Sequence, residues 1–219
     1  MGFLDLEKHF VFVYSLPFLL AFFFLQDNHE LTNKIKQYGT YHRDPTNVMI
    51  HIIFVPALMF TMMLWTANVR LAPDSVTTSP YANLSTLTAT AYAVLYALLE
   101  PMAGTLLAPY VVAQSLVGTY LVERFGNDAN KIAGIVQLFS WVCQFIGHGV
   151  YEKRAPALLD NLVQALFLAP LFVWLEVLFM FGYRPEFQRR MHEKMRLARS
   201  QLDAAATEKV GVKGEKKGP

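Results

Sequence analysis

Long apolar stretches separated by short polar segments run along most of this chain. Residues 48–65 approach the roughly 20 apolar residues with which an α-helix crosses a bilayer. Several similar stretches follow, with proline, glycine and charged residues between them. The pattern therefore predicts an all-α, polytopic membrane bundle with about four to six membrane segments. The predicted spans are Val48 to Trp65, Leu87 to Leu99, Ala103 to Val122, Ile132 to His148 and Leu162 to Gly182.

Three connections in this pattern carry their own predictions. Residues 46–47 are expected to cap the first long span, with Pro45 ending whatever precedes it. Glu100 is expected to cap a tight connection before Pro101. Pro170 lies in the middle of the last span, so we expect that span to be broken there, as a re-entrant hairpin or two half-helices. Such a break would return the basic C-terminal tail to the cytosol, where the positive-inside rule places it.

Composition agrees with a membrane protein and excludes several kinds of site. Only 16% of the 219 residues are charged, whereas about a quarter is usual for soluble domains. The single cysteine excludes an intrachain disulfide and any multi-cysteine zinc or iron–sulfur site. A net charge of +2 gives no support for a nucleic-acid partner. The expected partner is the lipid membrane, and the oligomeric state stays open.

Histidines at the ends of the predicted spans are the strongest candidates for chemistry. His42 and His51 flank the start of the first long span, and His148 ends a later one. Imidazole is costly to place in hydrocarbon, and it is a common ligand that suits iron. The number of crossings between these ends places them on the same membrane face. We therefore predict that the three imidazoles meet in a metal site.

A carboxylate accompanies the last of these histidines. Gln144, His148 and Glu152 are spaced four residues apart and share one helix face. Glu152 can therefore be a metal ligand, a residue that orients the imidazole, or a base. Two histidines and a carboxylate would resemble the facial set of non-haem iron oxygenases, and a three-histidine set is equally open. The predicted metal and catalytic residues are His42, His51, His148 and Glu152.

Three further residues are predicted to bind substrate. Lys153 and Arg154 follow the site carboxylate directly and could hold a substrate carboxylate at the headgroup level. Asn47 lies one helical turn before His51 and is placed with them. The alternative for the two basic residues is an ordinary cytosolic loop.

With these residues, the chain resembles the fungal endoplasmic-reticulum 2-hydroxy fatty acid dioxygenases that act in phytosphingosine breakdown. The matching stretches include Tyr38-Gly39-Thr40-Tyr41-His42 through Pro56 and Trp141 through Pro156, and they cover most of the chain from Tyr38 to Phe187. The resemblance implies Fe(2+) as cofactor, with His42, His51 and His148 serving it. It implies α-oxidation, in which a long-chain 2-hydroxy fatty acid and dioxygen give the acid one carbon shorter. It also implies a multi-pass protein of the endoplasmic reticulum membrane, with the iron site at the cytosolic face.

One segment departs from the family pattern. Residues 13–37 intervene between an N-terminal lead and the tyrosine–histidine motif, which the family places almost next to each other. We interpret this hydrophobic insert as a translated intron, and the alternative is a genuine extra hairpin or anchor. The expected organisation is a lead at 1–12, the insert, an oxygenase domain at 38–187, and a basic, partly disordered cytosolic tail at 188–219.

Two other classes of protein fit some of these features. In a membrane transporter or channel, the histidines would act as proton relays, but the polar residues here cluster at one face and not along the midplane. In a non-catalytic membrane scaffold, the histidines would simply lie at the interface. Bound iron would count against both.

Overall fold

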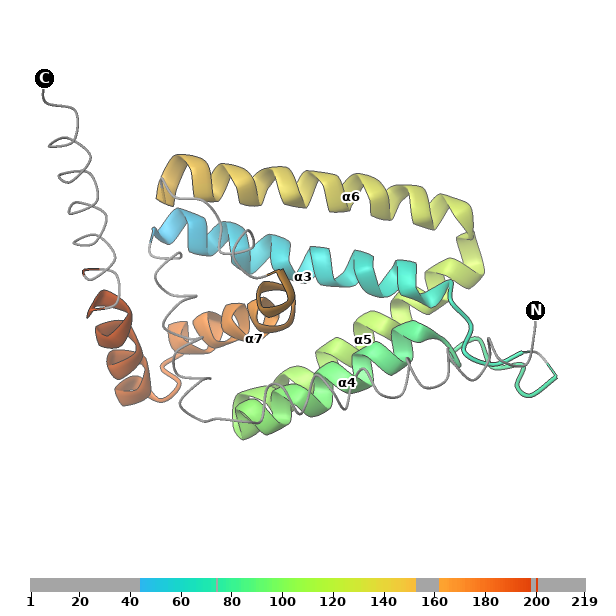
Figure 1. Cartoon of the computed structure of the whole chain (residues 1–219), viewed down its shortest axis with the longest axis horizontal. Helices are drawn as coiled ribbons and strands as arrows, with labels where there is room; N and C mark the ends of the chain where they lie inside the picture. Colours follow the sequence, from blue (N-terminus) through green and yellow to red (C-terminus); the bar gives the residue numbers. More distant parts are fainter. Residues whose placement is uncertain (1–43, 74, 153–161, 198–199, 201–219) are drawn as a thin grey trace, which may run out of the picture. The chain divides into compact units, whose positions relative to one another are not determined.

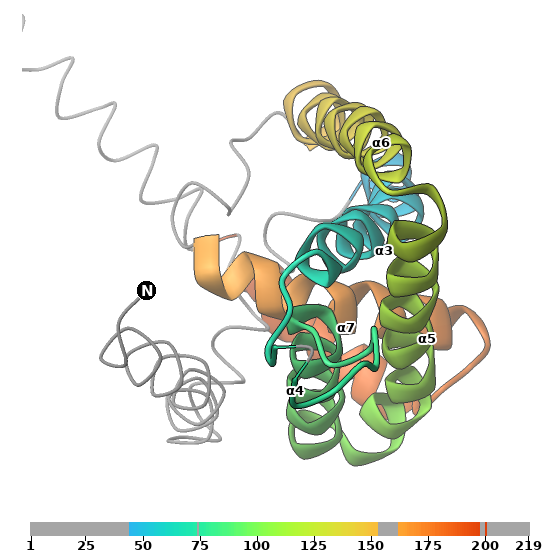
Figure 2. The same cartoon turned by 90° about the vertical axis from the view of Figure 1, so that its right-hand side faces the viewer.

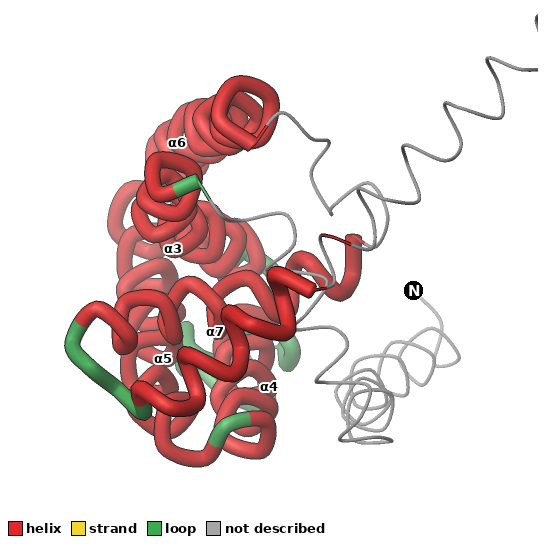
Figure 3. The backbone as a smooth tube through the Cα atoms, turned by 90° about the vertical axis from the view of Figure 1, so that its left-hand side faces the viewer, coloured by secondary structure: helices red, strands yellow, loops and turns green. Residues whose placement is uncertain are grey.

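The computed structural model describes residues 44–73, 75–152, 162–197 and 200. Within these residues the regular secondary structure is helical (Figure 3). An isolated β-bridge pairs Arg70 with Asn83. The chain divides into two compact units, described here separately. The described part of unit one comprises residues 54–73 and 75–141, and that of unit two comprises residues 44–53, 142–152, 162–197 and 200. The all-α prediction is confirmed.

The helices fall where the apolar stretches predict them (Figure 1). Three are long and apolar enough to cross a membrane, namely α3, α5, and α6 together with the short helix that follows it. Helix α4 and the 167–180 part of α7 are apolar but shorter. The bounds are Pro45–Ala67 for α3, Leu84–Leu99 for α4, Pro101–Phe125 for α5, Asn127–Ile146 for α6 and Leu162–Met180 for α7, with a further helix at 185–197.

In unit one, α4 and α5 form a hairpin around Glu100 and lie side by side (Figure 2). The N–H of Glu100 donates to the carbonyl of Tyr96 at the end of α4. Its carboxylate accepts from the N–H groups of Met102 and Ala103 at 3.0 and 2.9 Å, which satisfies two free donors of α5. The prediction that Glu100 caps this connection is confirmed. Gly104 then lies directly against the backbone of Tyr96.

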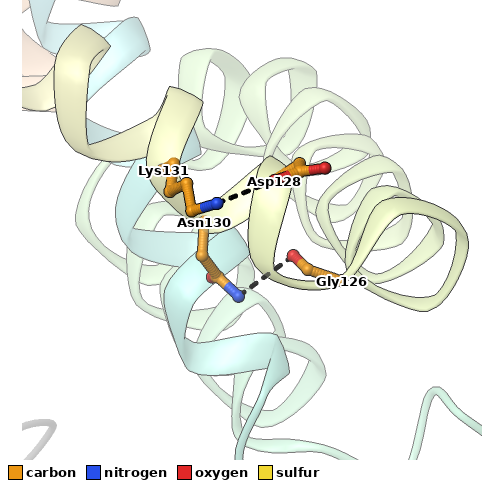
Figure 4. A network of polar contacts seen from close by, with 4 residues as sticks. All are labelled: Gly126, Asp128, Asn130 and Lys131. Carbon is orange, nitrogen blue, oxygen red and sulfur yellow. Dashed lines mark hydrogen bonds and ion pairs between the residues drawn. The ribbon is translucent and has the colours of Figure 1, made fainter.

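Helix α3 packs on α5 and α6 within unit one. Gly118 of α5 faces the backbone of Leu64, whose side chain is buried with Ala129 and Ala133 of α6. At the opposite end of unit one's helices, the turn from α5 to α6 has Gly126 at φ 53°, a left-handed conformation that favours glycine. The carbonyl of Gly126 accepts from the Asn130 side chain, next to a Lys131–Asp128 ion pair (Figure 4).

In unit two, α7 continues through Pro170 as one helix. The predicted break at this proline is therefore wrong, because the surrounding structure accommodates the proline without ending the helix, as is common in apolar helices. After a turn at Gly182, the 185–197 helix brings the Phe187 ring to 6.1 Å and the His192 ring to 6.5 Å from the Phe179 ring of α7. The topology of the C-terminal tail stays a prediction.

The start of α3 also differs from the prediction. Pro45 is the first residue of α3, and the residues before Asp44 lie outside the described part of the chain. The carboxylate of Asp44 accepts from the N–H groups of Thr46 and Asn47 at 2.8 and 3.4 Å. Proline suits the first helical position because it has no N–H to satisfy there, and an aspartate before it is a favourable cap. Asp44 therefore takes the capping role predicted for its neighbours.

The α4–α5 hairpin generates a stability prediction at Gly104. A Cβ at this position would lie 1.9 Å from the carbonyl oxygen of Tyr96, so the two helices would have to separate. We expect Gly104→Ala to lower the free energy of unfolding by about 3 kcal/mol, measured by reversible unfolding in mixed detergent. Gly134→Ala is the matched control, because its nearest neighbour would be a Trp65 ring carbon at 3.8 Å. Equal stability of the two variants would contradict this packing.

Candidate functional site

A π-helix follows α6 and carries the candidate residues of this end of the chain. It covers Gly147–Glu152, and its Gly147, His148 and Glu152 are buried. π-Helical turns are rare and occur frequently at functional sites. The sequence analysis expected an ordinary helix to end at His148, and so missed this change in winding. This short helix thus carries a buried histidine and a buried carboxylate, with exposed residues between them.

His51 of α3 and His148 of the π-helix meet in unit two. Their ring centroids lie 4.9 Å apart, the ring planes are nearly perpendicular at 83°, and each residue is 4% exposed. These two of the three predicted histidines therefore lie together, as expected, whereas their position at one membrane face stays a prediction. His42, the third predicted member, lies outside the described residues, as do Lys153 and Arg154.

The hydrogen bond of His51 determines which ring nitrogen carries the proton. Nδ1 lies 2.9 Å from the carbonyl oxygen of Asn47, one turn earlier in α3. A carbonyl only accepts hydrogen bonds, so Nδ1 must donate, and the neutral ring then carries its lone pair on Nε2. An imidazole that donates one N–H to a backbone carbonyl and ligates through the other nitrogen is the usual arrangement at metal sites.

Glu152 ties the π-helix to the start of α3. Its Oε1 accepts from the backbone N–H of Asp44 at 2.8 Å and from the side-chain amide of Asn47 at 3.4 Å. Glu152 is buried, and Asn47 is fully buried. A buried carboxylate needs such donors, because leaving it without them would cost several kcal/mol. The same residues thus hold two distant parts of the chain together beside the histidines.

Gly147 allows these parts to approach closely. A Cβ on Gly147 would lie 2.3 Å from Oδ1 of Asn47, so a larger residue would displace the amide that contacts Glu152. Asp44 and Gly147 are the two residues of this cluster that sequence reasoning did not select. Aspartate followed by proline is a recognisable start of a helix, whereas Gly147 stood out in the sequence only as part of the family match, beside His148.

The side chains at this site can be compared with the ligands that iron prefers in proteins. Two neutral imidazoles are suitable ligands for iron, and the proton position of His51 fits that use. Among the described residues, no three histidine, cysteine, aspartate or glutamate side chains form a group that could hold a metal ion. The described part of the chain therefore offers a histidine pair as part of a ligand set. The membership of His42 and Glu152, and the substrate contacts of Asn47, stay predictions.

Comparisons with known proteins give two matches. The family model described as 2-hydroxy-palmitic acid dioxygenase Mpo1-like matches residues 28–181, a range that includes every predicted site residue. The 2-hydroxy-palmitic acid dioxygenase MPO1 of Saccharomyces cerevisiae is 34% identical over 174 residues, covering 79% of this chain and 94% of that protein. No solved structure matches the chain. Residues 28–37 of the predicted insert lie inside the matched range, and the intron hypothesis stays a prediction.

The close approach at Gly147 gives a prediction specific to this site. We expect Gly147→Ala to cost about 1–3 kcal/mol of stability and to speed amide hydrogen exchange at the start of α3, because Asn47 must move away from Glu152. Melting temperature and hydrogen-exchange mass spectrometry measure the two effects. Gly149→Ala is the control in the same π-helix, since its Cβ would meet nothing within 4 Å. Unchanged exchange in the Gly147 variant would contradict the described packing.

Proposed function

Because the chain belongs to the 2-hydroxy-palmitic acid dioxygenase Mpo1-like family, we propose that it is an iron(II)-dependent dioxygenase of long-chain 2-hydroxy fatty acids. One observation carries this proposal: the match to the yeast dioxygenase covers 94% of that protein. The meeting of His51 and His148 supports the same conclusion independently, since it places two iron-type ligands in one buried cluster.

The proposed reaction is oxidative loss of one carbon. A 2-hydroxy acid and dioxygen would give the acid one carbon shorter, carbon dioxide and water. The bond between the carboxyl carbon and the hydroxyl-bearing carbon breaks, and that second carbon becomes the new carboxyl group. Dioxygen is the oxidant and is fully reduced, so the balance requires no other electron donor.

Iron(II), when bound, would supply the activation of dioxygen. We propose that His51 and His148 hold it together with His42, whose place in the sequence shortly before α3 suits this role. The carbonyl of Asn47 keeps the proton of His51 on Nδ1, which directs the lone pair of Nε2 to the metal. The low exposure of both described histidines keeps bulk water away from the reacting centre.

The substrate would lie with its head at the site and its acyl chain in the bilayer. Two residues after each histidine in the chain stands an exposed apolar side chain, Ile53 at 57% and Val150 at 60% exposure. Such surfaces suit lipid and not water. Lys153 and Arg154 follow Glu152 directly in the sequence, and we propose that they attract the substrate carboxylate. Asn47 has its amide against Glu152, so its contacts favour a role in holding the site together.

For the cellular location of this protein, we propose the endoplasmic reticulum membrane, with the site at its cytosolic face. The basic residues after α7 support a cytosolic C-terminus by the positive-inside rule.

The test is turnover by purified protein. After anaerobic loading with iron(II), the wild type should convert 2-hydroxypalmitate and dioxygen to pentadecanoic acid, measured by mass spectrometry. His42→Ala, His51→Ala and His148→Ala should each lower the rate by at least about 100-fold, because a ligand is lost. His192→Ala is the matched control, since this histidine is exposed on the 185–197 helix. Bound iron without turnover would contradict the proposed substrate, and failure to bind iron would favour a non-catalytic scaffold.

A further inference from the structure

The carboxylate of Glu152 is directed toward backbone and amide donors. Two hydrogen bonds end on the same oxygen, Oε1, and their donors lie at the start of α3, at Asp44 and Asn47. Hydrogen bonds from N–H groups to a carboxylate are strong and fix its orientation, more so in a buried setting. They also draw charge from the oxygen, which makes that oxygen a poorer metal ligand.

Hydrogen bonds link this carboxylate to His51, and the π-helix itself links it to His148. The side-chain amide of Asn47 donates to Glu152, and the backbone carbonyl of Asn47 accepts from Nδ1 of His51. On the other side, Glu152 belongs to the same π-helix as His148. The position of each imidazole therefore depends on the contact between Glu152 and Asn47. The side chain of Asn47 lies directly against Gly147.

A second observation separates Glu152 from direct ligation. Although His51 and His148 are adjacent, the described residues contain no group in which a third acidic, histidine or cysteine side chain joins them in a metal-binding arrangement. The carboxylate contacts the side chain of Asn47, whose backbone carbonyl holds His51, and among the described residues it does not complete a metal-binding group with the two histidines.

We propose that Glu152 is a positioning residue, which sets the spacing of the His51 and His148 imidazoles by holding the start of α3 against the π-helix. It is neither a metal ligand nor a base in the reaction. The inference rests on the proposed function, because the histidine pair has to be the metal site for the spacing to matter.

The variant Glu152→Gln distinguishes a positioning role from the roles of metal ligand and base. A glutamine keeps an oxygen that can accept from Asp44 and Asn47, but it has no charge and is a weak ligand and no base. A positioning role predicts that Glu152→Gln keeps the affinity for cobalt(II), used as an optical probe, within about threefold of the wild type. It also predicts an unchanged ligand-field spectrum and turnover within about tenfold, whereas Glu152→Ala should lose about 100-fold in affinity and turnover.

The controls make each outcome decisive. Glu186→Gln is the matched control, because this carboxylate is exposed on the 185–197 helix. Loss of cobalt(II) binding or a changed spectrum in Glu152→Gln would identify a metal ligand and overturn the proposal. Loss of turnover with binding and spectrum intact would identify a base and would also overturn it. An unaffected Glu152→Ala variant would contradict any role in positioning.

A second variant keeps the proposal testable where Glu152→Ala is poorly folded. Asn47→Ala removes the amide that donates to Glu152 but leaves the carboxylate itself in place. A positioning role predicts that Asn47→Ala binds cobalt(II) at least about tenfold more weakly than the wild type, and an unchanged affinity would overturn the proposal. If the wild type binds metal but does not turn over, the proposed reaction fails while this comparison still tests the contact of Glu152. If the wild type binds no metal, the proposed site fails, and the effect of Asn47→Ala is then read from melting temperatures.

Discussion

The carboxylate of Glu152 joins two segments that are 108 residues apart in the chain, and the arrangement of the site depends on this contact. Apolar helices pack together readily, but they do not fix the relative position of two polar side chains at their ends. A buried carboxylate does so, because it must be satisfied by donors of suitable geometry. Asp44 and Asn47 provide those donors, and Gly147 leaves the room for them. The closeness of His51 and His148 is a consequence of this local packing.

Placing such a site at the ends of apolar helices suits a reaction on lipids. A buried polar cluster would be costly in the middle of the hydrocarbon, whereas a helix start offers backbone N–H groups that are not used within the helix. Asp44 contributes to this arrangement in two ways. Its carboxylate caps α3, and its own backbone N–H donates to Glu152. The head of an amphipathic substrate can then reach the site while its acyl chain remains among the lipids.

Much of this organisation could be predicted from the sequence. The apolar stretches predicted the helices within a few residues, and counting crossings predicted that His51 and His148 would meet. The continuity of α7 through Pro170 could not be predicted, because it depends on packing that compensates for the missing hydrogen bond. The π-helix was also missed, since its i to i+5 winding follows from contacts between distant residues and has no local sequence pattern. The close approach at Gly147 became visible only with those contacts, and they favour one of the three roles that the sequence left open for Glu152.

The central claim is that His51 and His148 together hold iron. X-ray absorption spectroscopy of the anaerobic, iron(II)-loaded protein tests it most directly, because imidazole rings give characteristic multiple scattering. We predict a spectrum with imidazole ligands in the wild type, and fewer of them in the His51→Ala and His148→Ala variants. A wild-type spectrum fitted by oxygen ligands alone, or one that both variants leave unchanged, would contradict the account.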